Sequence, residues 1–246
     1  MPISKLQPFL LGLIGNPVEH SRSPQIFSDF FSSEGYLHGQ YSLFPLDHIN
    51  EVTSLIHSQS NLIGFNVTIP FKSEIIPLLT HISPQANAIG AVNTVKITRS
   101  DDGFELFGHN TDYFGFEETL NSLPQKPKQA VIIGTGGSSK AVSAVLTIHE
   151  IPFIFVSRSM ALTLPDQHFT DTLLVNCTPV GMWPNKDASP LPSLRNFDSS
   201  CTLIDLIYNP TTTELMAMAQ AYGIKSINGQ TMLKVQAEKA WEIFKN

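Results

Sequence analysis

A glycine-rich turn between an expected strand and an expected helix constrains this sequence more than any other feature. The apolar run 130–133 leads directly into the turn Gly134-Thr135-Gly136-Gly137-Ser138. Small and apolar side chains then recur at helical spacing, at Ala141, Ala144, Val145 and Ile148. Glycines in such a unit let backbone N–H groups approach a pyrophosphate, whose charge the helix N-terminus favours. The pattern predicts a dinucleotide-binding domain, with Gly134, Gly136, Gly137 and Ser138 at the cofactor.

Side chains around this turn indicate which class of nucleotide it could bind. Ser139 stands where a P-loop has its last glycine, and Ala141 follows Lys140 where serine or threonine would hold magnesium. A kinase or an ATPase is therefore not expected. The next expected strand is followed by Arg158, where an NAD site would place an acid for the ribose 2′-OH. A guanidinium suits the 2′-phosphate of NADP, and an exposed arginine at a strand end is the alternative interpretation.

Short apolar runs alternate with helical-period stretches along the chain, which predicts βαβ units and a parallel sheet. The expected strands are 10–14, 41–44, 62–67, 130–133, 153–156, 173–176 and 203–206. The segment 122–129, with two prolines and two lysines, predicts a surface connection that separates two α/β halves. Only thirteen residues lie between Ser159 and Leu173, where a helix and another strand would be expected. The second sheet is therefore predicted to be one strand short.

Two further helices are expected near the C-terminus. The first would begin with a capping box formed by Thr211 and Glu214. Its apolar face is expected at Leu215, Met218, Ala219 and Tyr222, and Gly223 would end it. The last helix places Gln236 on the same side as Leu233, Ala237, Ala240, Trp241 and Phe244. A polar group on an apolar side needs a hydrogen-bond partner, so we expect one for Gln236.

Charge and composition argue against several classes of partner. The net charge is −6, with 15 Lys+Arg against 21 Asp+Glu, and nucleic-acid binding would need a basic face. No apolar run approaches the roughly 20 residues of a membrane-spanning helix. Two cysteines, Cys177 and Cys201, cannot make a disulfide framework, and no Cys/His cluster has zinc-ligand spacing. We expect a cytoplasmic protein that binds a small molecule and no metal.

Distinctive blocks of sequence follow one another through both halves of the chain. The first half contains 16–24 (NPVEHSRSP), 64–72 (GFNVTIPFK), 88–94 (AIGAVNT) and 108–115 (GHNTDYFG). The second half contains the glycine turn, 176–182 (NCTPVGM), 205–210 (DLIYNP) and 229–237 (GQTMLKVQA). Together they resemble shikimate dehydrogenases over nearly the whole chain. The resemblance implies reversible, NADP-dependent reduction of 3-dehydroshikimate to shikimate, a step of chorismate and aromatic amino-acid biosynthesis.

The resemblance also implies roles for side chains in these blocks. Ser21 and Ser23, with Tyr208, would hold the carboxylate of shikimate. The ring hydroxyls would be hydrogen-bonded by Asn66, Thr68, Asn93, Asp112 and Gln236. Cofactor contacts beyond the glycine turn would come from Arg158, Thr178, Met182 and Gly229. Lys72 and Asp112 would be the catalytic pair, in which Lys72 supplies the proton and Asp112 orients lysine and substrate.

The architecture implied is α/β with two domains. Residues 1–109, completed by the C-terminal helix 230–246, would form an open substrate-binding domain, and residues 110–229 a Rossmann-like NADP-binding domain. Members of the family usually carry a second basic residue about three positions after the one matched to Arg158, and here Met160, Ala161 and Leu162 follow. NAD is therefore an alternative cofactor. The alternative functions are a quinate/shikimate dehydrogenase that uses NAD and a catalytically silent ligand-sensing homologue. A monomer or a homodimer is expected.

Overall fold

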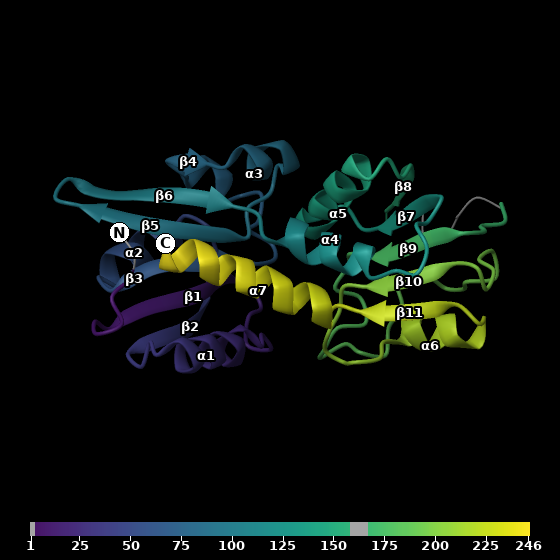
Figure 1. The fold of residues 1–246 in the computed structure, drawn as a ribbon, viewed down its shortest axis with the longest axis horizontal. Coiled ribbons are helices and arrows are strands. Elements are labelled where there is room, and N and C mark those ends of the chain that lie inside the picture. Colours follow the sequence, from purple (N-terminus) through teal and green to yellow (C-terminus); the bar gives the residue numbers. More distant parts are fainter. Residues whose placement is uncertain (1–2, 158–166) are drawn as a thin grey trace. The chain divides into compact units, whose positions relative to one another are not determined.

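The protein, described by a computed structural model over residues 3–157 and 167–246, folds into two compact units. The first unit comprises Met1–Thr111 and Lys234–Asn246, and the second comprises Asp112–Leu233. Figure 1 labels the helices and strands of both units. Over the described ranges, no helix is long and apolar enough to cross a membrane.

The first unit contains a six-stranded sheet with the order β2-β1-β3-β5-β6-β4 (Figure 1). Its strands are β1 (Phe9–Gly15), β2 (Gly39–Pro45), β3 (Leu62–Val67), β4 (His81–Ile82), β5 (Thr94–Ser100) and β6 (Gly103–His109). β1, β2 and β3 run parallel, as predicted. β5 pairs antiparallel with both β3 and β6, so the prediction of a purely parallel sheet is wrong here. The chain turns back at Gly103, whose φ is +137°, and forms a hairpin without a crossover helix.

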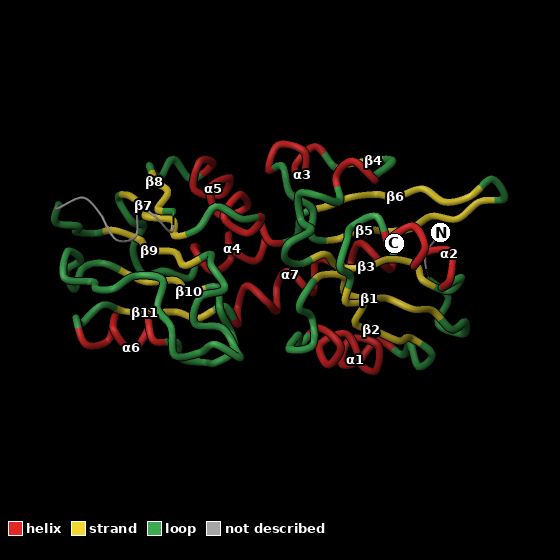
Figure 2. Tube along the Cα trace, turned by 180° about the vertical axis from the view of Figure 1, so that it is seen from behind, coloured by secondary structure: helices red, strands yellow, loops and turns green. Residues whose placement is uncertain are grey.

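Helices cover both faces of this first sheet, whose two sides are seen in Figures 1 and 2. They are α1 (Ser23–Glu34), α2 (Glu51–Ser58), η1 (Ile76–Leu78), α3 (Pro84–Ile89) and α7 (Gln230–Lys245). Because side chains alternate along a strand, β1 contributes to two cores. Phe9 and Leu11 pack with side chains of α1 and α7, while Leu10 and Ile14 pack with side chains of α2.

The C-terminal part of α7 is anchored in the first unit as its apolar stripe predicts. The buried side chains are Ala237, Ala240, Trp241 and Phe244. The Trp241 ring stacks on Phe9 with a centroid distance of 6.2 Å, and its Nε1 donates to Glu34 Oε1 at 2.8 Å. Lys245 Nζ lies 2.9 Å from Glu34 Oε2. These contacts fix the rotation of the helix about its axis, and with it the direction in which Gln236 projects.

The second unit contains a sheet in which every pair of strands is parallel. In the described part of the chain it has five strands in the order β11-β10-β9-β7-β8. They are β7 (Gln129–Ile133), β8 (Phe153–Val156), β9 (Thr172–Asn176), β10 (Thr202–Asp205) and β11 (Lys225–Asn228). Its helices are α4 (Asp112–Asn121), α5 (Gly137–Ile148) and α6 (Glu214–Ala221). The expected Rossmann-like α/β fold is confirmed, with a short sheet. The segment 122–129 is largely exposed as predicted, but it lies inside this unit, between α4 and the start of β7, so the prediction that it separates the two halves is wrong.

Two details of the helices in the second unit correct the predictions from spacing. On α5, Ala141 and Val145 are fully buried as predicted, but Ile148 is 65% exposed, and Val142 and Leu146 are buried in its place. The buried face is therefore rotated toward 142 and 146. α6 begins at Glu214, and its N-cap is Thr213, whose Oγ1 accepts from Met216 N, so the capping box at Thr211 is wrong. The register shifts because Thr213 is held by a second hydrogen bond, to Asp205 Oδ2.

The apolar face predicted for α6 is only partly correct. Leu215 and Ala219 are fully buried, but Tyr222 is 42% exposed, and Met216 is buried more deeply than Met218. The chain reverses at Gly223, whose φ is +71°, as predicted for the end of this helix.

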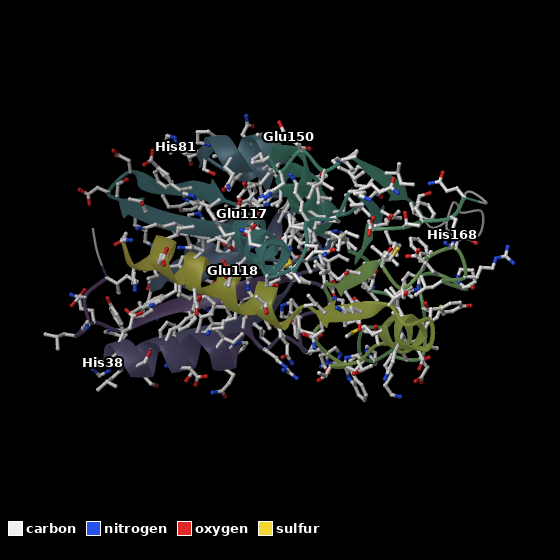
Figure 3. All side chains as sticks on the ribbon, turned by 45° about the vertical axis from the view of Figure 1, so that its right-hand side comes forward. His38, His81, Glu117, Glu118, Glu150 and His168 are labelled. Atoms are coloured by element: carbon white, nitrogen blue, oxygen red, sulfur yellow. The ribbon has the colours of Figure 1, made fainter. Side chains whose placement is uncertain are left out.

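Glu117, which is labelled in Figure 3, lies on α4 and contacts His149 at the end of α5 within the second unit. Tyr113 Oη donates to Glu117 Oε1 at 3.0 Å, and His149 Nε2 lies 3.5 Å from the same oxygen. Burial raises the pKa of Tyr113 to about 12, and the hydrogen bond to Glu117 and the negative charge of Glu117 contribute to the rise. The bond from Tyr113 lies within α4, so it is the contact of His149 with Glu117 that joins α4 to the end of α5.

Candidate active-site residues

The two serines assigned to the carboxylate lie together at the start of α1. Ser21 Oγ donates to Ser23 Oγ at 3.1 Å, and Ser23 N donates to Ser21 Oγ at the same distance. Arg22 occupies the N-cap position without a side-chain capping hydrogen bond. The first turn of a helix presents N–H groups and a partial positive charge, so two hydroxyls there suit a carboxylate.

A buried polar cluster lies where β3 ends and β5 begins. Asn66, 6% exposed, accepts at Oδ1 from Tyr41 Oη at 2.9 Å. Its Nδ2 donates to the carbonyl of Asn93 at 3.2 Å and to Thr94 Oγ1 at 3.1 Å. Because these groups are neutral and most can both donate and accept, the cluster suits a ligand that carries several hydroxyls.

Asn93 connects this cluster to the end of the first unit. Its Oδ1 accepts from Thr111 N at 2.7 Å, and its Nδ2 donates to Thr111 Oγ1 at 2.9 Å. The neighbouring Asn110 donates from Nδ2 to the carbonyl of Ala91 at 2.9 Å. All of these side chains are almost fully buried, so the segment 110–111, which directly precedes Asp112, is firmly held.

Thr68 and Lys72 lie on the loop that follows β3. Thr68 N donates to the carbonyl of Ile14 at 2.9 Å, and the carbonyl of Lys72 accepts from Val92 N at 2.7 Å. Both side chains are half-buried, while Phe71 between them is buried in the core. The backbone contact places Lys72 beside the segment that carries Asn93. The structure thus brings Asn66, Thr68, Lys72 and Asn93 into one region of the first unit.

The remaining substrate and catalytic candidates belong to other segments. Gln236, half-buried on α7, is part of the first unit. Asp112 is 5% exposed and is the first residue of α4, in the second unit. Tyr208 is a half-buried residue after β10, also in the second unit.

The glycine turn in the second unit has the open geometry that a pyrophosphate needs. Gly134, with φ +101°, makes the tight turn after β7, and a side chain there would lie 2.9 Å from Thr178 Cγ2. Gly136 is the N-cap of α5, and a Cβ built on it would meet nothing within 4 Å. Gly137 and Ser138 open the helix, which has no side-chain cap. The space over the helix N-terminus fits the phosphates of a dinucleotide.

Three other cofactor candidates follow the carboxyl ends of β9 and β11. Thr178 and Met182 lie after β9, and both are half-buried. Gly229 follows β11, and its N donates to the carbonyl of Ile207 at 3.0 Å. A side chain at Gly229 would collide with the carbonyl of Leu206. In parallel sheets ligands bind at this edge, so the positions agree with cofactor contacts. Arg158 lies outside the described residues.

Sequence reasoning did not assign roles to several polar side chains that complete these clusters. In the first unit they are Tyr41, Thr94 and Thr111. In the second unit they are Asn176, Asp205 and Thr213, all buried and joined by hydrogen bonds. The available signal was that Asn176 ends the predicted strand 173–176 and that Asp205 lies one residue before the end of the predicted strand 203–206. No group of His, Cys, Asp and Glu side chains in the described part of the chain could hold a metal ion.

Fold and site define the class: an α/β dehydrogenase, with a Rossmann-like dinucleotide unit and a separate unit that carries a buried polar cluster. Comparisons with known proteins identify the family within this class. Residues 13–95 match the family model of the shikimate dehydrogenase substrate binding domain. A Clostridium beijerinckii protein named shikimate dehydrogenase (NADP(+)) is 36% identical over 253 residues, covering 95% of this chain and 90% of its own. The chain belongs to the shikimate dehydrogenase family, and it is an oxidoreductase.

Solved structures agree with this placement. Shikimate dehydrogenase 1 from Peptoclostridium difficile is 34% identical with a TM-score of 0.83, over 96% of this chain and 91% of that one. Shikimate 5-dehydrogenase from Thermus thermophilus, solved in complex with NADP(H) and shikimate, is 29% identical with a TM-score of 0.78. That likeness covers 96% of this chain and 93% of the Thermus chain.

Proposed function

We propose that the protein reversibly reduces 3-dehydroshikimate to shikimate with NADPH. The observation that carries the proposal is the buried cluster of neutral side chains around Asn66 and Asn93, in the unit whose sequence matches the family's substrate-binding domain. A polyhydroxylated ring needs donors and acceptors of this kind, and a site that leaves them unpaired discriminates against ligands without hydroxyls.

Most of the side chains assigned to the substrate belong to the first unit, while Asp112 and Tyr208 belong to the second. Ser21 and Ser23 at the N-terminus of α1 would hold its carboxylate, aided by Tyr208. Hydrogen bonds to the ring hydroxyls would come from Asn66, Thr68, Asn93, Asp112 and Gln236. The half-buried position of Gln236 on the anchored helix α7 supports its assignment, since a polar group there can serve a ligand.

The proton of the reaction is assigned to Lys72. NADPH, when bound, supplies the hydride to the ring carbonyl carbon. The ammonium of Lys72 gives its proton to the carbonyl oxygen as negative charge develops there, and takes it back in the direction of shikimate oxidation. Asp112 accepts a hydrogen bond from the substrate hydroxyl and orients it. Lys72 is suited to the task because its backbone is tied to Val92, next to Asn93.

The cofactor is assigned to the second unit. Gly134, Gly136, Gly137 and Ser138 would hold the pyrophosphate, and Arg158 would hold the 2′-phosphate of NADP. Thr178, Met182 and Gly229 would complete the site from the neighbouring strand ends. The open space over Gly136 and the uncapped N-terminus of α5 support this assignment. Because Arg158 is not followed by the second basic residue that is usual in the family, we expect a preference for NADP over NAD that is weaker than in relatives with both residues.

The two functional parts would follow the chain as residues 1–109 with 230–246 for substrate and residues 110–229 for cofactor. The compact units of the structure support this division. We place the enzyme in the cytoplasm, where its substrate and NADPH would be made, and expect a monomer or a homodimer. The described cysteines Cys177 and Cys201 form no disulfide, which suits a reducing compartment.

Steady-state rates with two substrates and two cofactors test the proposal. Shikimate and quinate would each be offered with NADP and with NAD, and formation of reduced nicotinamide would be followed. We expect the largest kcat/KM for shikimate with NADP. A larger value for quinate or for NAD would identify the alternative dehydrogenase, and no reduction in any combination would contradict an active enzyme.

A further inference from the structure

A buried carboxylate lies in the second unit at the end of β10. Asp205 is 0% exposed, and in the described part of the chain its hydrogen-bond donors are all neutral. Thr213 Oγ1 donates to Oδ2 at 2.6 Å, while Asn176 Nδ2 and Ile207 N donate to Oδ1 at 3.0 and 3.1 Å. Burial raises the pKa of the Asp205 carboxyl, and these hydrogen bonds oppose the rise. Burying a carboxyl group is costly, so its presence needs a reason beyond packing.

The carboxylate determines which way a neighbouring amide faces. Asp205 and Asn176 are register partners on the parallel strands β10 and β9, which lie side by side in Figures 1 and 2. An ionised carboxylate only accepts hydrogen bonds, so Asn176 must turn its NH₂ group toward Asp205. Its Oδ1 then faces the other way, where it accepts from Thr178 N at 3.0 Å and from Thr178 Oγ1 at 2.7 Å.

The same hydrogen bonds shape the loop after β9. Because the Thr178 hydroxyl donates its proton to Asn176, its oxygen is able to accept from Val180 N, at 3.2 Å. The loop lies directly against the glycine turn, since a Cβ on Gly134 would be 2.9 Å from Thr178 Cγ2 and 3.5 Å from Thr178 N. A chain of hydrogen bonds thus runs from Asp205 through Asn176 to the loop that borders the expected pyrophosphate position.

We infer that Asp205 is a positioning residue for the dinucleotide: it orients the Asn176 amide, which holds Thr178 against Gly134. The inference rests on the proposed function, because Thr178 and the glycine turn are assigned to the cofactor there. Asp205 touches neither substrate nor cofactor, and acts through two other side chains. Its loss should weaken cofactor binding and leave the polar cluster of the first unit unaffected.

Two substitutions of Asp205 separate positioning from simple stabilisation. Asp205→Ala leaves the Asn176 amide without its partner, and we expect the Kd for NADP to rise at least about tenfold. Asp205→Asn can keep an oxygen toward Asn176 and Ile207 and an NH₂ group toward Thr213, so it should restore the Kd to within about threefold of wild type. In both variants the Kd for shikimate should stay within about twofold.

Thr213→Ala is the matched control. It removes the hydrogen bond from Thr213 to the same carboxylate and the N-cap of α6, and so should lower the melting temperature. Thr213→Ala keeps the hydrogen bond from Asn176 to Asp205 and the one from Thr178 to Asn176. The Kd of this variant for NADP should therefore equal that of wild type. Should Asp205→Ala not fold, Asp205→Ser replaces it, because a serine hydroxyl is too short to reach the Asn176 amide.

The outcome is judged by titration calorimetry with NADP and with shikimate separately, beside thermal melts. A selective loss of NADP affinity in Asp205→Ala, absent in Thr213→Ala, supports the inference. Equal NADP affinity in Asp205→Ala and wild type overturns it, as does an equal loss in Thr213→Ala. If wild-type protein binds no NADP, it is the proposed function that fails, which distinguishes the two results.

Discussion

The side-chain amide of Asn66 donates a hydrogen bond to the main-chain carbonyl of Asn93, 3.2 Å away. This bond joins the end of β3 to the residue that precedes β5, the strand that pairs antiparallel with β3. Both side chains are almost fully buried, and further buried hydroxyls complete the cluster. This arrangement fixes the orientation of the side chains to which substrate binding is assigned.

Asn93→Ala should lower both stability and shikimate affinity. The substitution leaves Thr111 N, which now donates to Asn93 Oδ1 at 2.7 Å, buried without an acceptor, at a cost of about 1–3 kcal/mol in the free energy of unfolding. Denaturant unfolding and the KM for shikimate would be measured. Asn110→Ala is the control, since it also loses a buried hydrogen bond, to Ala91, but is assigned no substrate contact. An equal rise in KM in both variants would contradict the role of Asn93.

Gly136→Val should weaken cofactor binding without unfolding the protein. The backbone at Gly136, with φ −82° and ψ −172°, is extended and accepts any side chain, and a Cβ there meets nothing within 4 Å. We expect the free energy of unfolding to change by less than about 1 kcal/mol, while the Kd for NADP rises at least about tenfold because the side chain fills the phosphate space.

Gly134→Ala provides the contrast for that experiment. It forces a side chain into φ +101° and close to Thr178 Cγ2, so stability should fall together with cofactor affinity. If Gly136→Val bound NADP as tightly as wild type, the pyrophosphate would not lie over this turn.

Arg158→Ala should weaken NADP binding far more than NAD binding. A hydrogen bond to a charged group contributes about 1.5–3 kcal/mol, which corresponds to roughly 10–100-fold in the KM for NADP. The KM values for both cofactors would be compared with those of Arg195→Ala, the same substitution at an exposed position of the second unit. Equal losses for the two cofactors would show that Arg158 does not recognise the 2′-phosphate.

His109 should make the protein sensitive to acid. Burial, and the nearby charge of Lys96, hold the pKa of His109 below its ordinary value. The stability that the neutral ring contributes is present above its unfolded pKa of about 6.5, and is lost as the pH falls through the lower folded pKa. His109→Gln cannot be protonated, so it should lose less unfolding free energy than wild type between about pH 7 and pH 5.

The matched control for this experiment is His81→Gln, which changes a largely exposed histidine of the same unit (Figure 3). Denaturant unfolding at each pH is the measurement. If His109→Gln lost as much unfolding free energy on acidification as wild type, His109 would not be the source of the acid sensitivity.

Most of the strands could be predicted because their cause is local. β3 and β8 occupy the predicted residues, since each is a short run rich in apolar and β-branched side chains, although β8 is partly exposed. The hairpin of β5 and β6 was missed although Asp102-Gly103 is a strong turn signal, because no strand was predicted between residues 94 and 109. The predicted strand 41–44 extends by two residues at its start and one at its end as β2 (Gly39–Pro45).

The candidate site was less predictable where it depends on contacts between distant residues. Asn176 and Asp205 are separated by 29 positions and meet only through the register of β9 and β10. Thr213 became the N-cap of α6 because Asp205 holds its hydroxyl, which local capping rules do not include. By contrast, Asn66 and Asn93 were assigned to the substrate from the sequence, and they prove to share one cluster.

The central claim is that Lys72 supplies the proton for reduction of the ring carbonyl, and the kcat of Lys72→Ala tests it most directly. We expect kcat to fall by about 10²–10⁴ while the calorimetric Kd for shikimate changes by less than about tenfold. Lys72→Arg, which keeps the positive charge but does not give up its proton at neutral pH, should be equally slow. Turnover of Lys72→Ala at the wild-type rate would contradict the account.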